Sequence, residues 1–118
     1  MRYNVWKNIK CSHETKLYQY GSDVIQNHTV GICAGGGNDE QVVKELIEKG
    51  INMLITGITR VNEYSKVAHQ LEKENNINLL GGTHYSSEKF ACIEMCKYFS
   101  KLGIPSEFVD DIPCFEDL

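Results

Sequence analysis

The sequence lacks any long apolar run, and no stretch approaches the roughly 20 apolar residues that a transmembrane helix requires. It also lacks a basic segment followed by an apolar one at its start, which is the pattern of a secretory leader. Its five cysteines, an odd number, suit reduced thiols better than a complete set of disulfides. We therefore expect a cytoplasmic protein without a membrane span.

Clusters of basic residues are missing as well. Twelve Lys and Arg residues are scattered among sixteen Asp and Glu residues, which leaves a formal charge of −4 and no basic patch for a nucleic-acid backbone. A Gly-x-Ser-x-Gly elbow is absent, and no Ser/His/Asp arrangement stands out. We expect neither direct nucleic-acid binding nor acyl-transfer chemistry.

What the sequence does contain is a repeated order of strand, loop and helix. Apolar strands are predicted at residues 29–35, 51–56 and 77–81, and "IPSEFVD" at 104–110 resembles a further short strand. A chain of 118 residues has room for one domain, with 1–28 as a less readable lead-in and 29–112 as the repeated core. This alternation predicts an α/β fold whose mainly parallel sheet of four to five strands is covered by helices. A strand at "YNVWKNI" in the lead-in would supply the fifth.

Three helices are predicted from apolar residues at helical spacing. The first runs from an N-cap at Asn38 or Asp39 to Gly50, with the inward side chains Val42, Val43, Leu46 and Ile47. The second covers residues 60–76, with the inward side chains Val61, Tyr64, Val67, Ala68 and Leu71. The third ends at Gly103, with the inward side chains Phe90, Ile93, Met95, Cys96 and Phe99.

Three polar or glycine-rich loops follow the predicted strands. They are "AGGGND" at 34–39, "TGITR" at 56–60 and "GGTHYSSE" at 81–88. The carboxyl ends of parallel strands share one edge of a sheet, and functional loops gather there. We therefore expect all three loops at the same edge.

His84 and Glu88 carry the sharpest chemistry in these loops. Side chains four residues apart share one face of a helix, and an imidazole with a carboxylate suits zinc, manganese or iron better than calcium. Two ligands leave at least one more to be found. In the alternative interpretation, Ser86 or Ser87 caps the helix and Glu88 complements its dipole. A cap of that kind does not need His84.

Gly35, Gly36 and Gly37 stand before the first predicted helix. Their backbone N–H groups could point at a phosphate or another anion, although the lysine of a Walker loop and a full Gly-x-Gly-x-x-Gly pattern are absent. A tight turn from strand to helix is the alternative explanation.

The thiols and the other histidines are predicted to have structural roles. Cys92 and Cys96 lie one helical turn apart without the tighter spacing of thiolate metal sites, so we expect them to be buried, and Cys33 to lie in the core. Three histidines without partners nearby in the sequence are predicted to lie at the surface or in local structure: His13, His28 and His69.

Taken in order, the blocks "VGICAGGGND", "MLITGITR" and "GGTHYSSEKF" resemble the C-terminal half of the NIF-three-like family, whose members are also named GTP cyclohydrolase 1 type 2 homologues. The resemblance covers residues 20–112. It implies an α/β protein of two similar halves, assembled as a toroidal homohexamer with two divalent metal ions facing its interior. The family block Gly-His-x-x-x-Glu implies that His84 and Glu88 bind metal.

The sequence departs from the family pattern in three ways. Thr83 stands in place of the Gly before His84, and Ile58 stands in place of the Glu of Thr-Gly-Glu. The remaining ligands of the family, a pair of adjacent histidines and an aspartate, belong to the N-terminal half, and this chain has no His-His pair. We therefore expect one half of a two-half protein with an incomplete metal site.

These observations predict a metal-binding domain of a metal-dependent hydrolase that contributes part of a dinuclear site. The alternatives are a non-catalytic regulatory or assembly module with a structural metal, and a small anion- or nucleotide-binding domain that uses the glycine loop. A homo-oligomer is the expected assembly. The substrate, the reaction and the identity of the metal stay open.

Overall fold

A computed structural model describes residues 15–110 of the chain. Four strands, β1 (Lys16–Tyr18), β2 (Gly31–Cys33), β3 (Met53–Thr56) and β4 (Asn78–Gly81), form one sheet in the order β1-β4-β3-β2. β2, β3 and β4 are parallel, and β1 runs antiparallel to β4. The predicted α/β fold with a mainly parallel sheet is confirmed.

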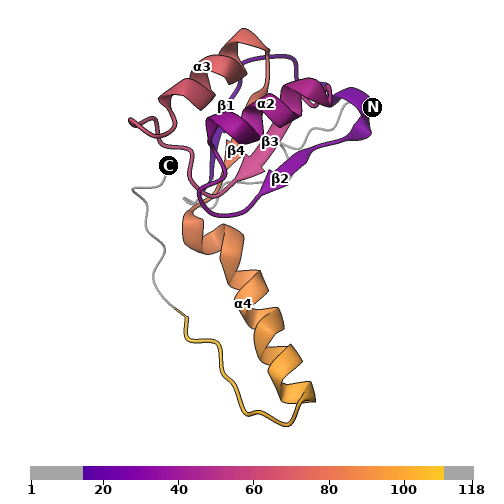
Figure 1. Cartoon of the computed structure of the whole chain (residues 1–118), viewed down its shortest axis with the longest axis vertical. Helices are drawn as coiled ribbons and strands as arrows, with labels where there is room; N and C mark the ends of the chain where they lie inside the picture. Colours follow the sequence, from indigo (N-terminus) through magenta and orange to yellow (C-terminus); the bar gives the residue numbers. More distant parts are fainter. Residues whose placement is uncertain (1–14, 111–118) are drawn as a thin grey trace.

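The core lies between this sheet and two helices, α2 (Glu40–Glu48) and α3 (Lys66–Glu74), which pack against each other (Figure 1). Its buried members come from both helices and from β3, β4 and the residue before β4: Val43, Leu46, Leu54, Ala68, Ile77 and Leu79. Val42 and Ile47 pack against them. The apolar face predicted for the first helix is therefore confirmed.

The ends of α2 also follow the prediction. The Asp39 carboxylate accepts hydrogen bonds from the backbone N–H groups of Gln41 (2.8 Å) and Val42 (3.1 Å), so Asp39 is the N-cap. Gly50 follows the helix with a φ of +63°, a left-handed conformation that glycine adopts without strain.

α3 begins later than predicted. The Asn62 side chain accepts the N–H groups of Tyr64 and Ser65, and the Ser65 hydroxyl donates to the Arg60 carbonyl, so a side-chain turn replaces the first helical turns. Val61 and Tyr64 are 55% and 88% exposed, and the prediction that they face inward is wrong. The prediction is wrong for Val67 too, which is on the helix but 40% exposed.

α4 (His84–Lys101) projects away from the sheet, as Figure 1 shows, and buries none of its side chains within the described part of the chain. Phe90, Met95 and Phe99 are exposed, so the inward face predicted for this helix is wrong. Cys92 is exposed and Cys96 is half-buried, which also corrects the prediction of two buried thiols. Over residues 15–110, no helix combines the length and hydropathy of a bilayer crossing.

The strand predicted at residues 104–110 does not form. Because α4 carries the chain away from the sheet, this segment pairs with none of the four described strands. Its Ser106 hydroxyl donates instead to the Cys96 carbonyl at 2.9 Å. β2 does form, as an edge strand whose Ile32 is 73% exposed.

The lead-in supplies a strand that was not predicted, β1, and a short 3-10 helix, η1 (Gln26–His28). Two buried asparagines tie the segment between them to the sheet. Asn78 accepts the N–H groups of Tyr20 and Gly21, and Asn52 accepts that of Gln26. The strand proposed for "YNVWKNI" lies outside the described residues.

Candidate metal centre

The three loops meet at one edge of the sheet, as expected. The Gly35 carbonyl accepts the backbone N–H groups of Gly57 (3.1 Å) and Ile58 (2.9 Å) and the Thr56 hydroxyl (3.2 Å). The Gly35 N–H donates to the Ser87 hydroxyl at 2.9 Å. One residue therefore joins the first loop to the second through its carbonyl and to the start of α4 through its amide.

Thr83 caps α4. Its hydroxyl accepts the Ser86 N–H at 3.0 Å, and the Ser86 hydroxyl accepts the Thr83 N–H at 2.9 Å, which is a reciprocal capping box. In the alternative interpretation Ser86 or Ser87 was the N-cap; the N-cap is Thr83, and Ser86 is its partner in the box. Glu88 lies beyond the first turn and does not cap the helix. The threonine that replaces the family glycine has a structural role of its own.

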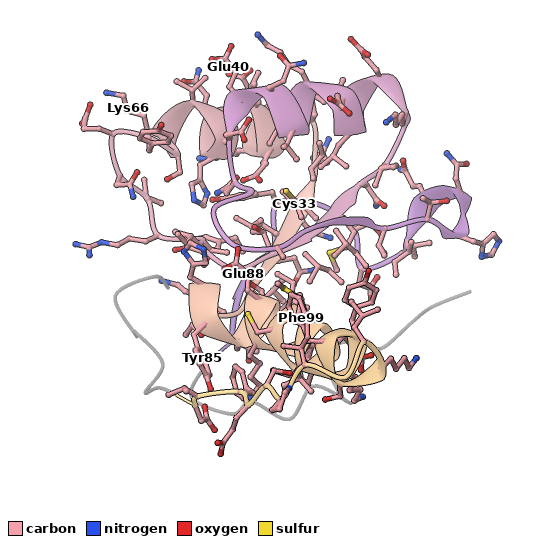
Figure 2. The ribbon with its side chains drawn as sticks, turned by 60° about the horizontal axis from the view of Figure 1, so that its bottom comes forward. Cys33, Glu40, Lys66, Tyr85, Glu88 and Phe99 are labelled. Atoms are coloured by element: carbon pink, nitrogen blue, oxygen red, sulfur yellow. The ribbon has the colours of Figure 1, made fainter. Side chains whose placement is uncertain are left out.

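His84 and Glu88 face each other at the start of α4. The imidazole Nε2 lies 3.0 Å from the Glu88 carboxylate Oε2, and each side chain is 48% exposed. Figure 2 shows Glu88 where α4 meets the loops. Two ligand atoms that each lie about 2 Å from one shared ion are separated by roughly this distance. The pair therefore suits a divalent cation in both chemistry and spacing.

Gly35 leaves the space that this pair occupies. A Cβ atom on Gly35 would overlap Glu88 Oε1 and lie 2.8 Å from His84 Nε2, and the φ of Gly35 is +68°. Both observations require glycine, since a side chain would have to displace the pair and adopt a strained backbone. The glycine that joins the loops is thus also the wall of the candidate site.

The described residues supply only these two ligands. Across residues 15–110, no group of three or more His, Cys, Asp or Glu side chains is placed to hold one ion. Ile58 stands at the position of the family Glu, and its backbone N–H donates to the Gly35 carbonyl. Its side chain lies near Gly36, where an added Cβ would be 3.8 Å from Ile58 Cδ1. Ile58 therefore contributes an apolar side chain to this edge instead of a carboxylate.

The glycine loop has fewer backbone N–H groups available to bind an anion than its sequence indicates. The Gly35 N–H is bonded to Ser87, and the Asp39 carboxylate already lies at the N-terminus of α2, where an anion would interact with the helix dipole. These contacts favour the interpretation of Gly35, Gly36 and Gly37 as a tight turn.

His69 is not at the surface, which corrects the prediction. It is 6% exposed, and its ring bonds to the Thr59 carbonyl and the Tyr20 hydroxyl. Burial lowers the pKa of His69, and burial raises the pKa of its neighbour Glu72 to about 8. The burial of His69 could have been predicted from its position next to Ala68, on the inward side of the predicted helix.

Comparison with known proteins agrees with the family resemblance found in the sequence. The sequence pattern of the family described as Duf34/NIF3 (NGG1p interacting factor 3) matches residues 3–111. A protein named GTP cyclohydrolase 1 type 2 homolog, from Archaeoglobus fulgidus, is 34% identical over 80 residues, which are 67% of this chain and 31% of that protein. The chain thus spans about a third of the length of this relative.

Two solved structures share the fold. Reduced HcgD from Methanocaldococcus jannaschii superposes with a TM-score of 0.65 at 18% identity, over 87% of this chain and 40% of that one. TTHA1606 from Thermus thermophilus superposes with a TM-score of 0.59 at 23% identity, over 83% and 36%. With the family pattern matched over residues 3–111, this chain belongs to the Duf34/NIF3 family.

Proposed function

We propose that this chain is a metal-binding domain of a hydrolase, in which His84 and Glu88 provide two ligands of a dinuclear centre. The observation that carries the proposal is the 3.0 Å approach of His84 Nε2 to Glu88 Oε2 beside a glycine that leaves room for both.

The chain's own residues would hold and shape this site. The Ser87 hydroxyl, bonded to the Gly35 N–H and to the His84 carbonyl, fixes the loop against the first turn of α4. Thr83 fixes the start of that turn, so the ring of His84 projects from a defined position. A divalent cation bound there supplies Lewis-acid polarisation of an electrophile and activates water.

The remaining ligands would come from another polypeptide segment, because residues 15–110 supply no third one. The ligand set implied by the family resemblance, with its adjacent histidines and aspartate in the other half, is consistent with this arrangement. Zinc, manganese and iron are the metals that imidazole and carboxylate ligands favour. The name of the Archaeoglobus relative suggests a cyclohydrolase-like reaction on a small molecule.

The test is metal binding by the chain and its variants. We expect His84→Ala and Glu88→Gln each to weaken the binding of Zn²⁺ or Mn²⁺ at least about tenfold, since even outer-shell changes cost that much. Titration calorimetry and elemental analysis measure the affinity and the metal content. His28→Asn is the matched control, because His28 is exposed, distant in sequence, and has a left-handed backbone that asparagine tolerates. Equal binding by the His84 and control variants would remove the metal proposal.

A non-catalytic assembly module is the second candidate, and the exposure of α4 favours it. Phe90, Met95 and Tyr98 on this helix and Leu102 at its C-cap are 55–63% exposed, an apolar surface of the kind that marks protein contacts. Light scattering should show a lower mass for Phe90→Lys than for the parent chain. Tyr64→Lys, at an 88% exposed residue away from α4, should leave the mass unchanged. A parent chain that is already monomeric would argue against self-assembly.

A further inference from the structure

A second polar cluster lies around His69 on α3. The ring nitrogen Nδ1 lies 2.9 Å from the Tyr20 hydroxyl and 3.5 Å from Glu72 Oε2. The other nitrogen, Nε2, lies 2.8 Å from the Thr59 carbonyl oxygen and 3.2 Å from Asn38 Nδ2. His69 and Glu72 are 6% and 0% exposed, so solvent does not compete for these contacts.

A neutral imidazole has one N–H, so only one of its nitrogens donates at a time. With the proton on Nε2, the ring donates to the Thr59 carbonyl while Nδ1 accepts the Tyr20 hydroxyl. With the proton on Nδ1, Nε2 accepts from the Asn38 amide and loses its bond to Thr59. The two tautomers therefore hold different loops, because Thr59 belongs to the loop after β3 and Asn38 to the loop after β2.

The charge state of Glu72 affects the relative stability of these two tautomers, because its carboxyl group lies beside Nδ1. Neither of its carboxylate oxygens has a hydrogen-bond partner within the described part of the chain, and burial raises its pKa to about 8. Below that pH, the side chain is a neutral carboxylic acid. Above it, a negative charge lies 3.5 Å from Nδ1 and favours a proton on that nitrogen.

The other titratable or charged groups around the ring come from β1 and the residues after it. The Tyr18 ring packs edge-on against His69 with 4.9 Å between centroids. Burial lowers the pKa of His69, the bond to the Thr59 carbonyl opposes this, and Lys16 adds to the lowering, so the net effect favours the neutral ring. Burial, Glu72 and Tyr18 raise the pKa of Tyr20, so its hydroxyl keeps its proton.

We propose that His69 is a positioning residue whose tautomer is set by Glu72. With Glu72 protonated, the His69 Nε2–H donates to the Thr59 carbonyl. With Glu72 ionised, the charge 3.5 Å away stabilises a proton on Nδ1, the Tyr20 oxygen 2.9 Å away accepts that proton, and Nε2 accepts from Asn38. The change releases one proton, from the Glu72 carboxyl group to solvent. The imidazole has one proton before and after the change: Nε2 loses a proton to solvent, and Nδ1 takes one up.

This switch bears on the edge where the three loops meet. Thr59 lies so close to Gly81 that a Cβ on that glycine would overlap the Thr59 methyl group, and Gly81 ends β4 shortly before His84. Asn38 closes the loop that begins near Gly35. Exchange between the tautomers therefore moves a hydrogen bond of His69 from Thr59, in the loop after β3, to Asn38, in the loop after β2.

Long-range ¹H–¹⁵N spectra of the histidine rings test the proposal, because they distinguish the two tautomers directly. In the parent chain we expect the Nε2–H form at about pH 6.5 and conversion to the Nδ1–H form with a midpoint near pH 8. In Glu72→Gln, which has no carboxyl group to ionise, the Nε2–H form should persist throughout. Glu48→Gln changes an exposed carboxylate on α2 and should titrate like the parent.

A parent chain that keeps one tautomer over the whole range would overturn the proposal, and so would an equal conversion in Glu72→Gln. If Glu72→Gln does not fold, Asn38→Ala provides the second test. Loss of the Asn38 amide donor should raise the midpoint of the conversion, and an unchanged midpoint would also count against the switch. No metal is added, so the outcome is independent of the proposed function.

Discussion

Glu72→Gln should raise the free energy of unfolding by on the order of 2 kcal/mol or more at about pH 8, and by much less at about pH 4.5. The reason is the burial of an ionisable group that has no hydrogen-bond partner among residues 15–110. Burial raises the pKa of Glu72 from 4.5 to about 8, and each pH unit of such a difference corresponds to about 1.4 kcal/mol. Burial of the new amide without its own partners offsets part of the gain.

The sign follows from proton binding. In the folded chain Glu72 keeps its proton up to about pH 8, whereas in the unfolded chain it loses the proton near pH 4.5. The stabilising contribution of this group is thus complete below about pH 4.5 and is lost as the pH rises to about 8. Glutamine does not ionise and escapes this loss. The lowered pKa of His69 reduces the stability of the fold as the pH falls, and it does so in the parent and in the variant alike.

Urea unfolding at the two pH values measures the effect. Glu48→Gln is the control, since an exposed carboxylate on α2 should give a change within about 0.5 kcal/mol at either pH. A gain of the same size at both pH values, or a loss at the higher one, would contradict the assignment of Glu72 as a neutral acid in the folded chain.

Gly35→Ala should separate His84 from Glu88. The new methyl group would overlap Glu88 Oε1 and approach His84 Nε2, and alanine at a φ of +68° is strained. We expect a loss of about 1 to 3 kcal/mol in the free energy of unfolding, and more than about tenfold weaker binding of Zn²⁺ or Mn²⁺. Chemical denaturation and calorimetric titration measure the two effects.

Gly36→Ala is the matched control for this prediction. A Cβ on Gly36 would make one ordinary contact, 3.8 Å from Ile58 Cδ1, and its φ is not in the left-handed region. The variant should keep both the stability and the metal affinity of the parent. If the two alanine variants behave alike, the space at Gly35 has no special relation to the His84–Glu88 pair.

Periodicity in the sequence predicted the central fold well. The parallel strands β2, β3 and β4 and the helix α2 follow from apolar patterns whose partners lie in the same unit, with Asp39 and Gly50 as local end signals. The pattern failed where burial depends on distant packing. Phe90 and Phe99 have helical spacing, but spacing does not show whether another element covers the helix.

The candidate site was predicted in part. The order of the strands was enough to bring the three loops to one edge, and helical geometry was enough to pair His84 with Glu88. The cluster around His69 was not predicted, because its partners Tyr20, Asn38 and Thr59 come from three separate segments. Contacts of this kind leave no period in the sequence.

The antiparallel pairing of β1 has a consequence for the order of folding during synthesis. Lys16 pairs with Gly81, so the first described strand finds its partner only when the last one has been made. The loop between them must close at an entropic cost that local units such as β2 with α2 and β3 do not bear. On a ribosome, β1 would therefore wait outside the exit tunnel, unpaired, until residue 81 had emerged, and its addition would be a late step of assembly.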